Sequence, residues 1–137
     1  GGTANVIVRI AADPIGSPLI SRPQSLIAMN LPSLEKFAPT VKPGGLIVVN
    51  ATLVNRDPER DDCTVLNVRS REVAEAAGNG RAANFVMLGA YVGATGVVSP
   101  AAVENAVATE FAGGKEKFVP ANVAAFRAGL AEAEEAR

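Results

Sequence analysis

The sequence contains no histidine and no tryptophan, and it has a single cysteine, Cys63. Without histidine the chain lacks the side chain that titrates nearest to neutral pH and the commonest metal ligand in proteins. One thiol cannot close an internal disulfide, and an iron–sulfur cluster normally needs about four cysteine ligands. The composition therefore argues against histidine-based catalysis and against a metal cluster held by this chain alone.

The chain also has no marked excess of either charge. Its 13 basic and 14 acidic residues give a formal net charge of −1. No run of lysine or arginine forms a basic stripe. Proteins that bind nucleic acid through its phosphates need such a stripe. The sequence therefore predicts no nucleic-acid partner.

Long hydrophobic runs are missing as well. The most apolar stretch, FVMLGAYVGATGVV at residues 85–98, is interrupted by Gly89, Gly93 and Gly96, and it falls short of the roughly 20 residues that a membrane span needs. We interpret it as a buried core helix in which Gly89 and Gly93 let another backbone approach closely. Residues 1–10 lack the basic-then-apolar layout of a signal peptide, so we expect a cytoplasmic protein without a membrane partner.

What the sequence does contain is a globular composition, with 48% hydrophobic and 20% charged residues. Apolar runs rich in β-branched residues predict strands over residues 4–10, 26–29, 46–49 and 64–68. Helices are predicted after Asn30, after Ser70 and after Ser99, and the two serines are expected to be N-caps. Two more helices are expected over residues 82–96 and 119–137. Together they predict an α/β fold: a three-layer, Rossmann-like parallel or mixed sheet flanked by helices, with a helical C-terminal end.

The order of these elements is unusual at the start of the chain. The first predicted strand begins almost at residue 1, and the complete strand–helix–strand unit begins only in mid-chain. At 137 residues the chain most naturally forms one domain. We therefore expect residues 1–137 to be a single domain that is N-terminally incomplete.

A glycine-rich phosphate loop between a strand and a helix is not found, since the chain has neither G-x-G-x-x-G nor the P-loop pattern. Gly44 and Gly45 precede a predicted strand and are interpreted as a tight turn. Asn30 and Asn50 each directly follow an apolar strand, at the sheet edge where ligands of parallel sheets usually lie. Their amides are candidates to orient a ligand or a neighbouring chain; the alternative is that each caps the next backbone turn.

Arg9 and Asn84 are two further candidates. Arg9, near the end of the first predicted strand, could meet a carboxylate or phosphate, or it could remain a solvated edge residue. Asn84 opens the long apolar helix and is most simply its cap or a satisfied polar group at the helix entry. No serine has a histidine to activate it, so the residues provide no candidate for a catalytic group, for a cofactor ligand or for a metal ligand.

Several ordered blocks, however, resemble a known family. GGTANVIVRIAADPIGSPLI, LIAMNLPSLEKFAPTVKPGGLIVVNATLV, GNGRAANFVMLGAYVGATGVVS and VPANVAAFRAGL are similar to the gamma subunit of the 2-oxoacid:ferredoxin oxidoreductases. Within that family, AMNLPSLEKF and RAANFVMLGA look most like the 2-oxoglutarate, or general keto acid, acceptor oxidoreductase gamma chain. Family members normally begin with a further strand and a glycine-rich turn, which do not precede Gly1 here.

The resemblance implies a subunit of an assembly that converts a 2-oxo acid, such as pyruvate or 2-oxoglutarate, and CoA to acyl-CoA and CO2. Thiamine diphosphate would be held mainly by alpha and beta subunits, and iron–sulfur clusters by cysteine-rich parts elsewhere. The expected partners are the alpha and beta subunits, a delta subunit where one exists, and ferredoxin through the complex. The isolated chain would bind no cofactor, would be inactive and could form a homo-oligomer.

Two alternatives remain open. VKPGGLIVV, residues 41–49, is also typical of an S-adenosylmethionine-dependent methyltransferase, although that fold needs an early glycine-rich loop that is not seen here. The chain could also be a pure interaction domain. Co-purification with thiamine-binding chains favours the oxidoreductase, and binding of a methyl donor favours the methyltransferase.

Overall fold

The structure is a computed structural model that describes residues 4–17 and 19–136. Its central layer is a parallel sheet of three strands in the order β1-β2-β3. The strands are β1 (Ser25–Ala28), β2 (Leu46–Asn50) and β3 (Thr64–Val68). The helices are α1 (Leu31–Phe37), α2 (Ser70–Ala76), α3 (Ala83–Thr95), α4 (Pro100–Glu110) and α5 (Val119–Glu135), with short 3₁₀ turns η1 (Ala38–Thr40), η2 (Gly80–Ala82) and η3 (Glu116–Phe118).

The central strand β2 is buried along its whole length. Successive side chains of a strand point to opposite faces of the sheet. Leu46 and Val48 accordingly lie in one hydrophobic core and Ile47 and Val49 in the other. The wholly apolar sequence of β2 is thus explained by a sheet that is covered on both faces, as in other parallel sheets.

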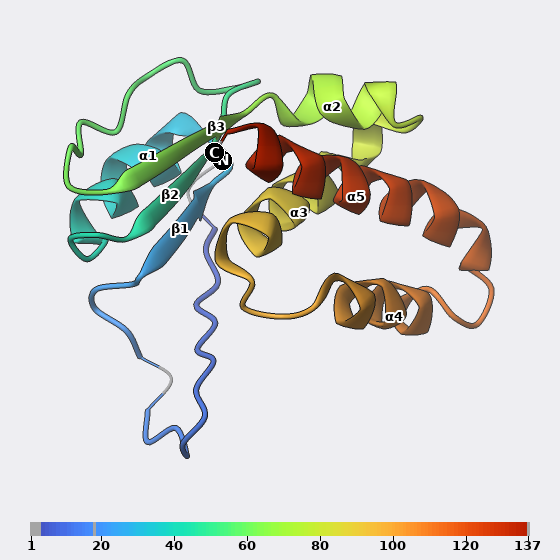
Figure 1. Cartoon of the computed structure of the whole chain (residues 1–137), viewed down its shortest axis with the longest axis horizontal. Helices are drawn as coiled ribbons and strands as arrows, with labels where there is room; N and C mark the ends of the chain where they lie inside the picture. Colours follow the sequence, from blue (N-terminus) through green and yellow to red (C-terminus); the bar gives the residue numbers. More distant parts are fainter. Residues whose placement is uncertain (1–3, 18, 137) are drawn as a thin grey trace.

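The two faces are covered by helices of different size. Helix α1 and turn η1 pack on one face through Leu34 and Ala38. Helices α2, α3 and α5 cover the other face, where Val86, Met87 and Ala125 contribute to the core. Figure 1 shows the resulting three layers, with α1 on one side of the sheet and α3 and α5 on the other. The predicted α/β class is confirmed, and the sheet is parallel.

The closest helix contact joins α3 and α5. A methyl group at Gly89 would lie 2.1 Å from the carbonyl oxygen of Phe126, and one at Gly129 would lie 2.1 Å from that of Val86. One at Gly93 would lie 2.8 Å from the Cβ of Ala133. The predicted close approach at Gly89 and Gly93 is confirmed, and Gly129 is the matching small residue on α5.

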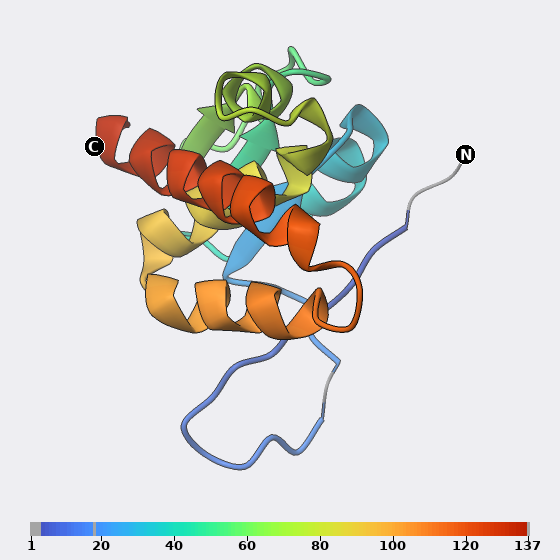
Figure 2. The same cartoon turned by 90° about the vertical axis from the view of Figure 1, so that its right-hand side faces the viewer.

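Helix α4 forms an outer layer beneath α5, as Figure 2 shows. Ser99 caps it by accepting a hydrogen bond from the N–H of Ala102 at 3.1 Å, as predicted. The ring of Phe111, after α4, packs against the rings of Phe85 and Phe118, with centroid separations of 6.3 Å and 6.4 Å. These contacts hold the start of α3, the end of α4 and the start of α5 together.

The predicted strand at residues 4–10 is wrong. These residues pair with no strand among the described residues, and Figure 2 shows them as a coil outside the sheet and the helices. Val6 and Val8 are 85% and 71% exposed. Their β-branched side chains favour an extended backbone, but a strand also needs a neighbour to complete its hydrogen bonds.

Two further predictions need correction. Ser70 is the first residue of α2, not its N-cap; Arg69 occupies the cap position without a side-chain hydrogen bond. The long apolar helix expected over residues 82–96 is confirmed as α3, but the apolar stretch 85–98 is not helical to its end. The helix stops at Thr95, because Gly96 adopts a left-handed φ of 64°. Val97 and Val98 are therefore about one third exposed, at 37% and 36%.

Replacing Gly89 or Gly129 with alanine should lower the free energy of unfolding by about 1–3 kcal/mol, because the added methyl group forces α3 and α5 apart. Urea unfolding followed by circular dichroism measures the change. Gly16→Ala is the control, since nothing lies within 4 Å of a methyl group at that position. Equal stability losses in all three variants would contradict this account.

The loop between α4 and α5 is closed by the carboxylate of Glu116. Its oxygens accept hydrogen bonds from the backbone N–H groups of Gly113 and Gly114, each at 3.0 Å. Together with the N–H of Glu116 itself, these donors hold the pKa of Glu116 below its usual value.

The Glu116 carboxylate therefore stabilises the fold at pH values above its unfolded-state pKa, and this contribution is lost as the pH falls through the lower, folded-state pKa. We expect Glu116→Gln to be less stable than the parent at neutral pH and equally stable in acid. Thermal unfolding of both proteins, measured from neutral to acidic pH, tests this expectation. Glu134→Gln is the control, because Glu134 makes no ion pair with a described residue. A stability difference that does not change with pH would contradict the expectation.

Candidate functional site

The carboxyl ends of the strands carry the predicted asparagines. Asn30 is the N-cap of α1, with an extended backbone, and its Oδ1 accepts a hydrogen bond from the N–H of Ser33 at 3.0 Å. The capping alternative is therefore observed for this residue. Its amide nitrogen forms no hydrogen bond with any described residue, although the side chain is half-buried. Asn30 thus keeps a donor that the fold does not use.

Asn50, in contrast, is fully engaged in the fold. It is 3% exposed, and its Nδ2 donates to the carbonyl oxygen of Met29 at 3.1 Å. Its Oδ1 accepts from the hydroxyl of Ser70 at 2.6 Å and from the N–H of Thr52 at 3.3 Å. Because Met29 follows β1 and Ser70 follows β3, this one side chain connects the ends of all three strands.

The loop after β2 is held by a second set of bonds. The hydroxyl of Thr52 donates to Oε2 of Glu72 at 3.1 Å and accepts from the N–H of Arg71 at 3.1 Å. Thr52 therefore fixes this loop to the first turn of α2. Among the described residues at this edge, Asn50, Thr52 and Ser70 use their side chains to hold the chain together, and none of the three is a carboxylate or thiol that could perform acid–base or nucleophilic chemistry.

Arg9 and Asn84 do not join this network. Arg9 lies in the exposed N-terminal segment, where its Nη1 donates to the carbonyl oxygen of Ser17 at 2.6 Å. Asn84 is exposed in the first turn of α3, and Ala82 is the N-cap of that helix, so the predicted capping role of Asn84 is wrong. Of the four candidates, only Asn30 and Asn50 lie at the carboxyl edge of the sheet.

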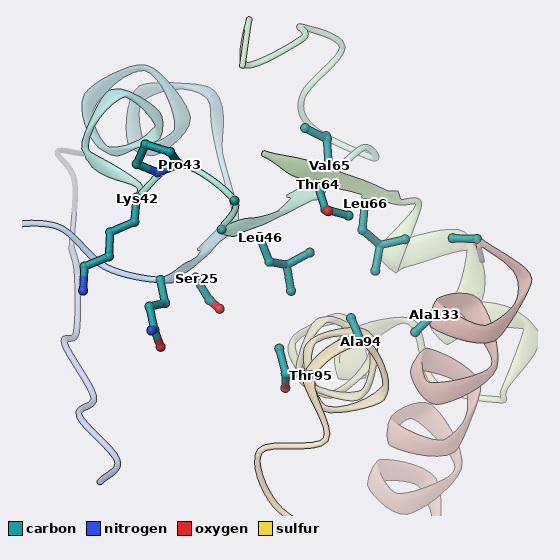
Figure 3. A pocket seen from close by; sticks show the side chains of 14 residues that line it. Ser25, Lys42, Pro43, Leu46, Thr64, Val65, Leu66, Ala94, Thr95 and Ala133 are labelled. Carbon is teal, nitrogen blue, oxygen red and sulfur yellow. The ribbon is translucent and has the colours of Figure 1, made fainter. Parts of the chain in front are cut away.

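A hollow that the sequence did not indicate lies at the opposite, amino edge of the sheet. It has a volume of about 530 Å³ and begins at the first residues of the strands, Ser25, Leu46 and Thr64. Ala94 and Ala133 close its other side, and Figure 3 shows Leu46 and Ala94 across the same space. Lys42 is the one charged residue in its lining, so the hollow can hold an apolar segment but offers no acid–base pair.

The turn that lines this hollow is held by several hydrogen bonds. Gly44 has a φ of 81°, which favours glycine, and its N–H donates to the carbonyl oxygen of Asp62 at 2.6 Å. Arg60 donates to both carboxylate oxygens of Asp62, at 2.7 Å and 2.8 Å, and to the carbonyl oxygen of Ala38 at 2.7 Å. The Arg60 hydrogen bonds hold the pKa of Asp62 below its usual value. Gly44–Gly45 is thus the tight turn that was predicted.

Metal and membrane sites are not indicated in the described part of the chain. No three or more of its cysteine, aspartate and glutamate side chains form a group that could hold a metal ion. Cys63 is half-buried, and its Sγ donates to the carbonyl oxygen of Lys42 at 3.5 Å. None of the described helices combines the length and apolar character of a membrane span.

Comparison with known proteins connects this fold to a family of redox enzymes. The family model for pyruvate ferredoxin/flavodoxin oxidoreductase matches residues 1–132. The chain is 36% identical over 137 residues to ketoisovalerate oxidoreductase subunit VorA of Methanothermobacter thermautotrophicus, covering 98% of this chain and 28% of that protein. It is 32% identical over 135 residues to 2-oxoglutarate synthase subunit KorC of Methanothermobacter marburgensis, covering 94% of this chain and 71% of that protein.

A solved structure from the same class of enzyme has a similar fold. The gamma subunit of a keto/oxoacid ferredoxin oxidoreductase from Geobacter sulfurreducens PCA superimposes with a TM-score of 0.73 at 32% identity, over 82% of this chain and 64% of that one. The chain spans only about a quarter of the length of the ketoisovalerate relatives, 27% and 28%. These matches are subunits of a ketoisovalerate oxidoreductase, a 2-oxoglutarate synthase and a keto/oxoacid ferredoxin oxidoreductase, and they give no support to the methyltransferase alternative.

Substituting Asn50 with alanine removes the bond to Met29 and leaves the buried hydroxyl of Ser70 without its acceptor, at a cost of about 1–3 kcal/mol for that group alone. We expect the double variant Asn50→Ala/Ser70→Ala to be destabilised by less than the sum of the two single variants, because no hydroxyl then remains unpaired. Urea unfolding of the four proteins measures the coupling. Strictly additive losses would show that the two side chains do not depend on each other.

Proposed function

Because the chain belongs to the pyruvate ferredoxin/flavodoxin oxidoreductase family, we propose that it acts as the gamma-type subunit of a 2-oxoacid oxidoreductase. The observation that carries the proposal is its likeness, in sequence and in fold, to a gamma subunit of a keto/oxoacid ferredoxin oxidoreductase. Residues 1–137 would serve as one domain of that enzyme in the cytoplasm. The isolated chain would have no activity of its own.

The reaction of the complete enzyme would convert a 2-oxo acid and CoA to acyl-CoA. The carboxylate leaves as CO2, the acyl carbon forms a thioester bond with the sulfur of CoA, and two electrons pass to ferredoxin or another acceptor. Relatives carry the names of ketoisovalerate and 2-oxoglutarate enzymes. The choice between such substrates would belong to the subunits that hold the reacting groups.

The donor groups of this chain support that division of labour. Its single cysteine falls short of the roughly four thiolates of an iron–sulfur cluster. The chain lacks the glycine-rich phosphate loop that commonly binds a diphosphate. Thiamine diphosphate would be held mainly by the alpha and beta subunits, and the iron–sulfur clusters by cysteine-rich parts elsewhere, with a delta subunit in assemblies that have one. CoA would be a ligand of the assembled complex.

The role of this chain would then be to contact those subunits, and Asn30 is a candidate for one contact. Its Oδ1 is used inside the fold to cap α1, whereas its amide nitrogen has no partner among the described residues. An unused donor beside the carboxyl edge of the sheet can donate to a carbonyl or carboxylate of a neighbouring subunit.

Substitutions at Asn30 separate the two roles. Asn30→Ser keeps an oxygen that can cap α1 but removes the amide donor, so it should weaken assembly or turnover of the complex several-fold while the chain stays as stable as the parent. Asn30→Ala should weaken assembly similarly and also lower the free energy of unfolding by about 1 kcal/mol. Unchanged assembly and turnover in both variants would count against the contact.

Reconstitution tests the proposed function itself. The chain is co-expressed with the neighbouring alpha and beta chains, and CoA-dependent reduction of a dye is assayed with several 2-oxo acids. We expect turnover that requires this chain, with the preferred 2-oxo acid identified by its rate. A complex that turns over equally well without the chain would contradict a required role, and a chain that does not associate at all would contradict the subunit assignment.

A further inference from the structure

A second concave surface lies between α2 and α5, away from the strand ends. This α2/α5 groove has a volume of about 300 Å³ and is lined by Val73, Ala76, Ala77, Ala128, Ala131, Glu132 and Glu135. Figure 1 shows α2 lying above α5, and Figure 2 shows α5 on the outside of the molecule. The floor is formed by short apolar side chains, and the two glutamates stand on the α5 side.

The glutamates are arranged unfavourably for the isolated helix. Glu132 and Glu135 lie three residues apart on α5, so the two like charges are neighbours on its surface and repel each other. They are also at the C-terminal end of the helix, where the macrodipole already favours positive charge. No basic residue lies in the last turn of α5, and no described residue forms an ion pair with either carboxylate.

We propose that the α2/α5 groove receives a basic segment of a partner subunit. That segment carries two lysine or arginine residues about one helical turn apart, which meet Glu132 and Glu135, and a short apolar side chain that enters the alanine floor. The pairing relieves the repulsion between the two carboxylates and offsets their position at the helix end, where no described residue forms an ion pair with them. This inference depends on the proposed function, because it requires a partner subunit.

The groove favours this occupant over others by charge and by size. The anionic side excludes an acidic protein surface and a phosphate-bearing ligand by repulsion. The short side chains of Ala76, Ala128 and Ala131 leave room for a small apolar group. The volume of the groove, about 300 Å³, stands at the lower limit of small-molecule pockets, roughly 300–1,000 Å³. It suits one or two side chains of a protein.

Charge reversal with a matched control tests the proposal. Glu132→Lys/Glu135→Lys reverses the two charges that line the groove. Glu134→Lys reverses one charge in the same turn of α5, at a residue that does not line the groove, and it is compared with Glu132→Lys and Glu135→Lys made singly as well as together. A further variant, Ala131→Leu, fills the floor without altering charge. Circular dichroism and thermal unfolding verify that each variant is folded, and association with the co-expressed alpha and beta chains is measured by titration at several salt concentrations.

The double charge reversal should weaken association at least about tenfold and abolish most of its salt dependence, since close charge pairs govern both. Ala131→Leu should weaken association with the salt dependence retained, and Glu134→Lys should change the association by less than about twofold.

If the parent associates and the double variant binds equally well, the groove is not the contact, while the proposed function stands. If the parent does not associate, the proposed function itself fails. Self-association of the chain that the double variant abolishes would make a second copy the occupant and overturn the proposal.

Discussion

The structure depends on strand β2, which is covered on both faces and hydrogen-bonded along both edges. A polar side chain at the end of such a strand must find its partners inside the protein, since an unsatisfied buried amide costs about 1–3 kcal/mol. Asn50 meets this requirement through Met29 and Ser70, which lie just beyond the other two strands. Hydrogen bonds of Asn50 therefore join the strand ends at the carboxyl edge of the sheet, and a hollow lies at the amino edge.

The helical side of the sheet is organised by a second constraint, the close approach of α3 and α5. Gly89 and Gly129 bring the two backbones together, which places α5 against α2 and leaves its outer face, with Glu132 and Glu135, beside the α2/α5 groove. Because alanine and glycine have small side chains, a layer built from them buries little area per residue, and its outer surface is shallow. Surfaces of this kind suit docking of another protein chain better than enclosure of a substrate.

These features give a consistent account of a family member that has an α/β frame and few chemical groups. In many parallel sheets the carboxyl edge of the strands binds a nucleotide or substrate; here Asn50 uses that position to hold the chain together, and Asn30 retains one donor. That arrangement supports the division of labour that we propose, with reacting groups on other subunits and contacts on this one. The fold alone would not distinguish it from an enzyme with its own active site.

The sequence by itself determined the class of the fold, because β-branched runs, the Pro–Gly–Gly turn and the Ser99–Pro100 start signal are local properties that need no partner. It also indicated the family and the close approach at Gly89 and Gly93. Tertiary structure decided the rest. Whether residues 4–10 form a strand depends on a neighbour, whether Asn50 faces a ligand or Ser70 depends on the register of three strands, and the two hollows arise between elements that are distant in sequence. Periodicity describes the faces of each element, whereas only packing decides which faces meet.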